Sequence, residues 1–374
     1  MSAGFSREAD MTDQWHSETV GSLLRPPELV EARRRHEAGE LATPDFKRIE
    51  DVAVDEAVRL QEKAGLDVIA DGELRRDSWL SPFSEGFTGF ERAGVAMPWK
   101  DESGERTEAS TRRPVVVDRL QRRQSPITLE EWVFLRGKAA GPAKATMPGA
   151  EMAAAMYDEK LSRPAYPTRD DYHAHVIELL RWEVSELVRL GCRYIQLDSP
   201  QYGALTDPEL REAFRQSGSD PDAMIDAGIE MDNAIIDGFP GVTFGLHICR
   251  GNAMSRYYAS GSYEPLTRIF TRSRFGRFLL EYDDARSGGF EPLREVPADR
   301  VVVLGLVTTK KPQLEDPDVL RSRIEEAARF VPLDRLALSP QCGFASVLAG
   351  NRISPAEQAA KLALVSDVAT KVWG

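Results

Sequence analysis

The chain has 374 residues and a formal net charge of −12, which argues against a nucleic acid or an anionic membrane surface as a partner, because either would need a basic face. Hydrophobic residues make up 42% of the chain, but no apolar run approaches the ~18 residues of a membrane-spanning helix. The amino-terminal stretch lacks the apolar centre of a secretory signal, and three cysteines do not make a disulfide scaffold. We therefore expect a soluble cytoplasmic protein.

Eight short runs rich in Val, Ile and Leu alternate with longer segments that have helical periodicity. In chain order, the predicted strands are Glu18–Leu23, Asp67–Asp71, Ala143–Met147, Arg193–Asp198, Val242–Cys249, Arg277–Asp283, Val301–Thr308 and Leu336–Pro340. Nearly continuous apolar strands that alternate with helices are typical of a parallel sheet covered on both faces. Eight such units predict a closed (β/α)8 barrel, the TIM barrel, as a single domain over residues 1–374. An open doubly wound sheet is the alternative, but "DGELRRDSW" after the second strand is not the glycine-rich turn that it would show.

Three long helices have recognisable ends. The first is predicted to start at Thr43 as N-cap and to stop at Gly65. The second runs from Thr168, another predicted N-cap, to Gly191, and the last starts at Ser354.

One region breaks the alternation. Residues 87–123 are charged and rich in Gly and Arg, and "RRPVVVDRL" within them has the pattern of a hairpin arm. We interpret this region as an insertion between the second and third barrel strands. The sequence leaves open whether the insertion covers an active site or is a surface excursion.

Active sites of barrels of this kind lie at the carboxyl ends of the strands. Residues capable of chemistry gather at these predicted ends: Ser22, Asp71, Glu73, Asp198, His247, Cys249, Glu281, Asp283, Asp284, Thr308, Thr309, Lys310 and Cys342. Their distribution therefore supports an active site at this end of the barrel.

His247 and Cys249 are two positions apart on one strand, so their side chains point to the same side. With Cys342 and an acid of the sixth strand they make a four-ligand set that suits zinc, although ligand type alone leaves iron or copper open. Packing as a small buried hydrophobe is the alternative for each cysteine, and Cys192, at the other end of the barrel, fits that alternative.

A zinc ion with two thiolate ligands and a carboxylate is a weak Lewis acid, because its ligands are negatively charged. Such a site is poorly suited to making hydroxide. It can still hold a substrate thiol as a thiolate at neutral pH, where a free alkyl thiol is mostly protonated. The ligand set therefore favours alkyl transfer to a thiol over hydrolysis.

The sequence resembles a known family, the cobalamin-independent methionine synthases, and in particular their short, methionine synthase II-like members. The resemblance extends from "ETVGSLLRP" to the carboxyl terminus and rests on "ADGELRRD", "RRPVVVD…SPITLEEW", "YIQLDSP", "GLHICRGN", "LLEYDDARS", "GLVTTKKP" and "SPQCGF". It implies the barrel that the strand pattern predicts.

The resemblance implies that the family's zinc ligands fall on His247, Cys249 and Cys342, with one zinc ion per chain. It also implies an acidic ligand on the sixth strand. "LLEY" aligns Glu281 with that position, whereas counting back from "ARS" points to Asp283, so both remain candidates.

The resemblance further implies that Ser22, Glu73 and Asp198 bind homocysteine, whose thiol attacks the N5 methyl group of 5-methyltetrahydrofolate. Two positions depart from the family pattern. Lys310 stands where the full-length members place a histidine that is the proposed proton donor, and Pro148 stands where a folate-stacking tryptophan is expected. Lys310 is therefore a candidate catalytic residue, while the folate half of the site is altered.

Three functions remain in competition. The first is a methyltransferase that makes methionine from homocysteine with 5-methyltetrahydrofolate or another methyl donor. The second is a zinc enzyme that opens an epoxide with a thiol such as coenzyme M, and the third is a non-catalytic zinc-binding barrel. Retention of Glu73 and Asp198 favours an amino-acid thiol. The expected partners are thus a small-molecule thiol and an alkyl donor, and the sequence leaves a homo-oligomer open.

Overall fold

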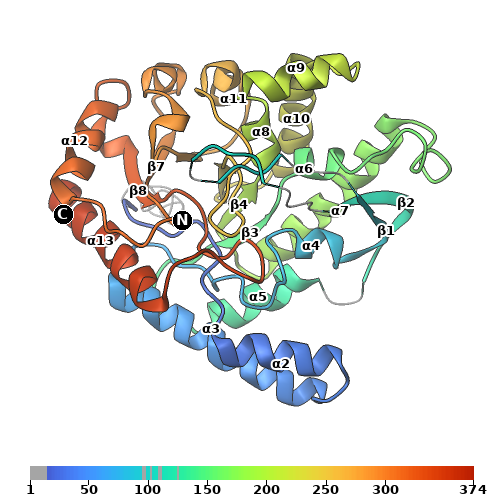
Figure 1. The fold of residues 1–374 in the computed structure, drawn as a ribbon, viewed down its shortest axis with the longest axis horizontal. Helices are drawn as coiled ribbons and strands as arrows, with labels where there is room; N and C mark the ends of the chain where they lie inside the picture. Colours follow the sequence, from blue (N-terminus) through green and yellow to red (C-terminus); the bar gives the residue numbers. More distant parts are fainter. Residues whose placement is uncertain (1–14, 95–97, 102, 108–111, 124–125) are drawn as a thin grey trace, which may run out of the picture.

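A parallel sheet of six strands, in chain order, forms the centre of the molecule (Figure 1). The computed structural model describes residues 15–94, 98–101, 103–107, 112–123 and 126–374. The strands of this sheet are β3 (Ala145–Pro148), β4 (Tyr194–Asp198), β5 (Thr243–Ile248), β6 (Arg277–Glu281), β7 (Val301–Val307) and β8 (Leu336–Pro340). They match the third to eighth predicted strands to within a few residues. Every residue of β7 and β8 is buried, as expected for strands covered on both faces.

The six-stranded sheet is closed into a barrel by the two segments predicted as the first and second strands. These segments pair with their neighbours only through isolated bridges. Their parallel bridges are Ser17 to Leu338, Glu18 to Val68, and Ile69 to Ala143. These bridges connect β8 back to the chain just before β3, so the predicted (β/α)8 barrel is confirmed. The predicted continuous strands Glu18–Leu23 and Asp67–Asp71 are wrong.

The side chain of Gln61 explains why the second of these segments does not form a longer strand. The amide of Gln61 accepts a hydrogen bond from the N–H of Ala70 and donates one to its carbonyl oxygen, at 3.0 and 2.7 Å. Both backbone groups of Ala70 are thereby bound to a helix side chain. They are not available to a strand ladder.

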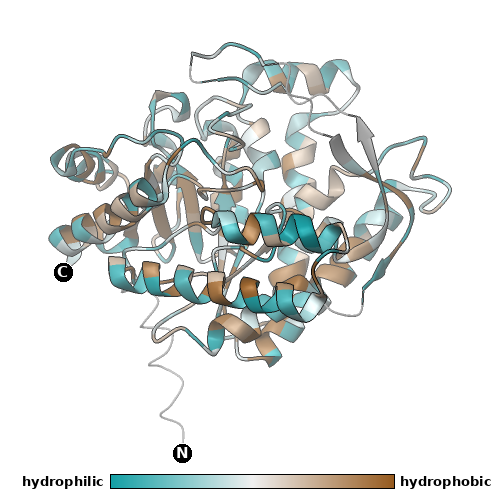
Figure 2. Cartoon of the chain, turned by 60° about the horizontal axis from the view of Figure 1, so that its bottom comes forward, coloured by the Kyte–Doolittle hydropathy of each residue, from teal (hydrophilic) through white to brown (hydrophobic). Residues whose placement is uncertain are grey.

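Helices surround the strands (Figure 1). The α-helices are α2 (Pro27–Glu37), α3 (Thr43–Ala64), α4 (Ser81–Ser84), α5 (Ile127–Arg136), α6 (Ala150–Ala154), α7 (Arg169–Arg189), α8 (Pro200–Ala204), α9 (Pro208–Gln216), α10 (Pro221–Ile236), α11 (Thr267–Arg272), α12 (Pro317–Ala327) and α13 (Pro355–Trp373). Short 3₁₀ turns occupy Glu264–Leu266, Ala285–Ser287, Glu291–Glu295 and Leu333–Arg335. Figure 2 shows the central strands mostly in the hydrophobic colour and hydrophilic residues along the covering helices. Within the described ranges, we find no helix with the length and hydropathy needed to cross a membrane.

Two of the three predicted helix starts are confirmed by capping boxes. The Thr168 hydroxyl accepts a hydrogen bond from the N–H of Asp171, whose carboxylate in turn accepts one from the N–H of Thr168. Ser354 and Glu357 make the same reciprocal pair at the start of α13. Each box satisfies two N–H groups that the first helical turn leaves without partners.

The start of α3 differs by one residue from the prediction. Thr43 is the first helical residue, and Ala42 takes the cap position without a side-chain hydrogen bond. Pro44 lies in the first turn, where the missing N–H has no intrahelical partner to lose. The predicted stop at Gly65 is confirmed, because Gly65 caps the helix with a φ of 80°.

The insertion forms the predicted hairpin from β1 (Phe87–Gly94) and β2 (Arg112–Arg122), which pair antiparallel. The register shifts at Gly89, whose φ is 99°. A Cβ atom at Gly89 would press against the carbonyl oxygen of Asp118, so glycine permits this bulge. Figure 1 shows the hairpin at one side of the barrel, near α4.

A buried ion network lies near the amino ends of the strands. The carboxylate of Glu18 pairs with Lys144 and Arg277, and it accepts a hydrogen bond from the Tyr194 hydroxyl at 2.9 Å. Burial raises the pKa of Glu18, but the two cations lower it more, so the pKa lies below its ordinary value. All four side chains are buried, and each therefore depends on the others for its partners.

We predict that Glu18→Ala lowers the free energy of unfolding by about 3–5 kcal/mol, because it leaves two buried cations without their anion. Urea denaturation measures this change. Glu31→Gln is the matched control, since Glu31 pairs with Arg34 on the exposed face of α2 and its loss should leave the midpoint unchanged. A Glu18→Ala midpoint equal to that of the control would contradict the structural role of the network.

Candidate metal centre and adjoining cavity

Three potential metal ligands meet at the carboxyl end of the barrel. His247 is in β5, Cys249 follows the strand directly, and Cys342 follows β8. One donor atom from each residue lies within 4.8 Å of the others, and all three residues are buried. The parity of β5 and the adjacency of strand ends therefore bring together the three donors that the sequence singled out.

The ring of His247 is oriented by the neighbouring strand. Its Nδ1 atom is 3.2 Å from the carbonyl oxygen of Leu279 in β6, and its buried Nε2 atom has no hydrogen-bond partner in the part of the chain that the structure describes. An Nδ1–H that donates to the backbone leaves the Nε2 lone pair available, which is the usual arrangement of a metal-binding histidine. Because buried polar atoms are rarely left unpaired, this atom indicates a site for a ligand.

The two cysteines lie against each other and perturb each other's acidity. Contact with Cys249 lowers the pKa of the Cys342 thiol well below its ordinary value, and the neighbouring His247 lowers it further against the effect of burial. The same contact with Cys342 raises the pKa of Cys249. A metal ion that binds both sulfur atoms as thiolates would displace their protons.

Glu281, the first candidate for an acidic ligand, ends β6 beside this group but is not one of the three clustered donors. Its Oε2 atom accepts a hydrogen bond from the N–H of Arg250 at 2.9 Å, and its Oε1 atom is 3.2 Å from Arg286 and 3.5 Å from Lys310. Burial raises the pKa of Glu281, but Lys310, Arg286 and Arg250 together lower it to about 2. The carboxylate is therefore ionised and anchored next to Cys249.

Asp283, the second candidate, lies beyond the strand and is 3.4 Å from the guanidinium of Arg286. Burial raises its pKa to about 6. Arg286 thus contacts both acids, and the identity of a fourth ligand stays a prediction.

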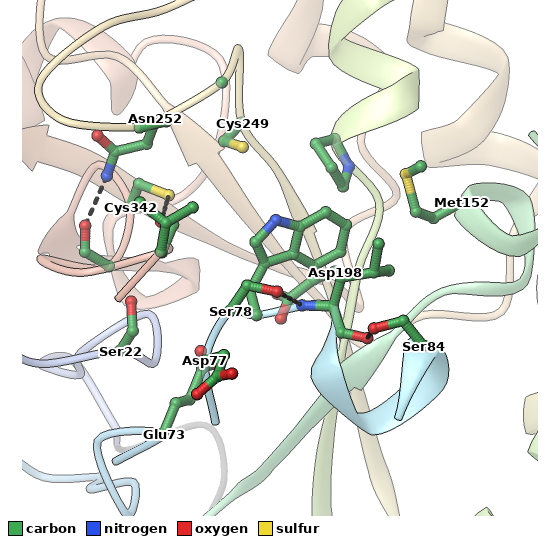
Figure 3. A pocket seen from close by; sticks show the side chains of 18 of the residues that line it. Ser22, Glu73, Asp77, Ser78, Ser84, Met152, Asp198, Cys249, Asn252 and Cys342 are labelled. Atoms are coloured by element: carbon green, nitrogen blue, oxygen red, sulfur yellow. Dashed lines mark hydrogen bonds between the residues drawn. The ribbon is translucent and has the colours of Figure 1, made fainter. Parts of the chain in front are cut away.

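A cavity of about 450 Å³ opens beside the three donors (Figure 3). His247, Cys249 and Cys342 are part of its wall, and so are Ser22, Glu73 and Asp198. The structure thus gathers the predicted metal-binding and substrate-binding residues around one space. Within the described ranges, Lys310 and Glu281 are not part of this wall.

Glu73 is held in an unusual backbone conformation. Its φ is 55°, directly after Gly72 at 76°, and a left-handed conformation is uncommon for a residue with a side chain. Its Oε1 atom accepts a hydrogen bond from Thr146 at 2.9 Å and is 3.5 Å from Arg76, whereas Oε2 is buried and has no hydrogen-bond partner among the described residues. One carboxylate oxygen is therefore available to a ligand.

Asp198 stands at the end of β4, where its Oδ1 atom accepts a hydrogen bond from Gln196 at 2.7 Å. Burial raises the pKa of Asp198, His247 lowers it and the nearby charge of Glu73 raises it, and the pKa that results is about 7. Two carboxylates in a buried setting attract a cation between them.

Ser22 contacts the loop after β8. The Ser22 hydroxyl is 3.4 Å from the N–H of Ala345, and a Cβ atom at Gly343 would overlap it. Asn252 links the same loop to the end of β5, because its side chain donates to the carbonyl oxygen of Gly343 at 2.6 Å. These contacts fix the loop that carries Cys342.

The cavity also has an aromatic side that sequence reasoning missed. We use this name for Trp79, Phe90, Trp99 and Tyr258, which all line the cavity, as does Met152. Trp99 and Tyr258 meet edge to face, with ring centroids 5.4 Å apart. The only sequence signal was the presence of two tryptophans, one just after the second predicted strand and one in the insertion, and neither position revealed that its loop folds over the barrel.

The chain matches known proteins over nearly its whole length. A family model described as the catalytic domain of cobalamin-independent synthase matches residues 15–251 and 278–370. The uncharacterized protein YxjH of Bacillus subtilis is 36% identical over 99% of this chain and 98% of its own length. A methionine synthase of Pyrococcus abyssi is 24% identical over 87% of this chain and 84% of its own.

Solved structures agree on the fold. A Listeria monocytogenes protein described as a candidate vitamin-B12 independent methionine synthase has a TM-score of 0.72 and 26% identity, and the match covers 96% of this chain and 98% of that one. A B12-independent methionine synthase from Shewanella, in complex with selenomethionine, has a TM-score of 0.75 and 22% identity over 96% and 98% of the two chains. Together with the family match over most of the sequence, these findings show that the chain belongs to the family of cobalamin-independent synthase catalytic domains.

Proposed function

We propose that the protein transfers a methyl group to the thiol of homocysteine and so makes methionine. One observation carries this proposal: the His247, Cys249 and Cys342 donors line one cavity together with two buried carboxylates, Glu73 and Asp198. Soft sulfur donors suit a thiol-activating metal, and the carboxylates suit an ammonium group. A free amino acid with a thiol side chain offers both.

The three donors fit zinc, which is commonly bound by imidazole and thiolate ligands. Bound there, zinc would hold a substrate thiol as a nucleophilic thiolate at neutral pH. We propose Glu281 as a further ligand or as a nearby negative charge, with Asp283 as its alternative. In either position the acid adds negative charge beside the sulfur ligands, which favours transfer to a thiol over activation of water.

Glu73 and Asp198 are proposed to hold the amino group of homocysteine. The free Oε2 atom of Glu73 and the carboxylate of Asp198 offer charged acceptors in a buried setting, where such hydrogen bonds are strong. Ser22, which lines the same cavity, is proposed to position the substrate beside Glu73 and Asp198. These contacts fix the amino-acid end and so direct the thiol toward the donor set.

The wall disfavours the reaction of an epoxide with coenzyme M. A sulfonate calls for cationic contacts, and among the described residues that line the cavity there is no lysine or arginine. A purely structural metal site is also disfavoured, because it would not need an adjoining cavity with an unpaired buried carboxylate oxygen.

The purified protein is expected to contain about one zinc ion per chain. Cys342→Ser should remove most of it, because serine is a poor ligand for this ion. Metal analysis by mass spectrometry measures the content. Cys192→Ala is the matched control, since Cys192 is buried away from the three donors and should not affect zinc. Native protein without metal, or a Cys342→Ser variant that retains it, would sink the proposal.

Addition of homocysteine should add one sulfur neighbour to the zinc ion in X-ray absorption spectra. Homoserine, which replaces the thiol with a hydroxyl group, is the matched control and should add none. Identical spectra with and without homocysteine would remove it as the thiol substrate.

Asp198→Asn should weaken homocysteine binding about 10-fold or more, because it removes one charged partner of the ammonium group. Titration calorimetry measures the affinity at unchanged zinc content. Binding of 4-mercaptobutyrate, which lacks the amino group, should be the same in the wild type and in the variant. An equal loss for both ligands would show that Asp198 does not recognise the ammonium group.

A further inference from the structure

The charge of the cavity wall points to the class of the second substrate. Five carboxylate side chains line the cavity: Glu73, Asp77, Glu85, Glu91 and Asp198. Within the described ranges no lysine or arginine lines it. Two of these acids have a cation beside them that does not itself line the cavity: Asp77 is 2.7 Å from Arg33, and Glu73 is 3.5 Å from Arg76. An acidic wall attracts a cationic ligand and repels an anionic one.

The aromatic side adds a second feature of cation recognition. Trp79, Phe90, Trp99 and Tyr258 line the cavity together with the acids. Aromatic rings attract cations through the negative charge of their faces, and they bind methylated onium groups in this way. Trp79 is only half-buried, so part of its ring is open to a ligand.

The size of the cavity favours a small second substrate. Pockets that hold one drug-sized ligand measure about 300–1,000 Å³. The cavity here, at about 450 Å³, is in the lower part of that range and has to accommodate two reactants. It therefore suits homocysteine with a compact donor better than homocysteine with a folate.

The position of Lys310 also bears on the donor. When a methyl group leaves the nitrogen of a folate, that nitrogen needs a proton. Lys310, the sequence candidate for this task, has its Nζ atom 3.5 Å from Glu281 and is not part of the cavity wall. A donor whose leaving group departs as a neutral molecule needs no such acid.

We propose that the methyl donor is a small sulfonium cation, bound among the aromatic side and the lining carboxylates other than Glu73 and Asp198, which hold the amino group of homocysteine. This inference rests on the proposed function. The thiolate sulfur of homocysteine attacks a methyl carbon of the sulfonium ion and forms a new carbon–sulfur bond. The old carbon–sulfur bond breaks, and its electron pair goes to the sulfonium sulfur, which departs in a neutral thioether. The thiol proton of homocysteine is released when the thiolate forms, and the methyl transfer itself consumes no proton and no oxidant.

The insertion between the second and third barrel strands supplies part of the proposed donor site. Phe90 and Glu91 come from β1, and Trp99 follows it in the same insertion. The hairpin thus contributes both an acid and two rings to the donor side of the cavity, whereas the strand ends supply the thiol side. Donor specificity in this chain is therefore assigned to the insertion.

Binding of trimethylsulfonium to the zinc-loaded protein tests the aromatic contact without any turnover. Isothermal titration should show that Trp79→Leu weakens binding about 5- to 30-fold, the range for loss of one partly desolvated cation–π contact. Trp79→Phe retains a ring and should lose less. Trp182→Leu, in α7 outside the cavity, is the matched control and should bind like the wild type. No binding by the wild type, or equal binding by all variants, would overturn the proposal.

Turnover identifies the donor. Methionine formation from homocysteine is compared with trimethylsulfonium, S-methylmethionine, S-adenosylmethionine, glycine betaine and 5-methyltetrahydrofolate. Methionine from a sulfonium donor, with little from the others, supports the proposal. Methionine from the folate or from betaine alone overturns the sulfonium donor but leaves methyl transfer to homocysteine intact.

Absence of methionine with every donor also overturns the sulfonium proposal. X-ray absorption then shows whether the donor alone is wrong or whether homocysteine does not bind the zinc ion either. If homocysteine still adds a sulfur neighbour to zinc, thiol binding stands and only the donor is wrong. If it adds none, the proposed function fails as well.

Discussion

The register between neighbouring parallel strands is the constraint on which the site depends. Asp198 of β4 pairs with His247 of β5, and His247 pairs with Leu279 of β6, whose carbonyl oxygen orients the imidazole. A slip of one residue would turn the side chains of a strand to the opposite face. The same pairing therefore aligns the sheet, places an acid next to a histidine, and selects the ring nitrogen that is left for a ligand.

Arg250 fixes the end of this register. It is fully buried, its N–H donates to the Glu281 carboxylate, and its guanidinium donates to the Tyr263 hydroxyl at 2.9 Å and to the carbonyl oxygen of Gly261 at 2.7 Å. Burying a cation costs free energy unless it is fully hydrogen-bonded. The partners of Arg250 come from the segments around β5 and β6. The hydrogen bonds of Arg250 can all form only if these segments stay together. Cys249, one residue earlier, is held by the same arrangement.

Much of the barrel and the core of the site could be predicted from the sequence, because both follow from local patterns. Strand alternation and parity sufficed to group His247, Cys249 and Cys342. The short pairing of the second strand could not be predicted, because it depends on Gln61, a helix side chain that binds the backbone of Ala70. The aromatic side could not be predicted either. Trp79 and Trp99 reach the cavity only through the paths of their loops, and no periodicity in the sequence encodes these paths.

The closeness of Cys249 and Cys342 has a consequence for the chemical durability of the protein. Their donor atoms lie within 4.8 Å of each other, and oxidants convert two neighbouring thiols to a disulfide through a sulfenic acid. A metal ion bound to both sulfur atoms would compete with that oxidation, because it engages the electron pairs that an oxidant attacks. Metal occupancy and resistance to oxidation are therefore linked in this arrangement.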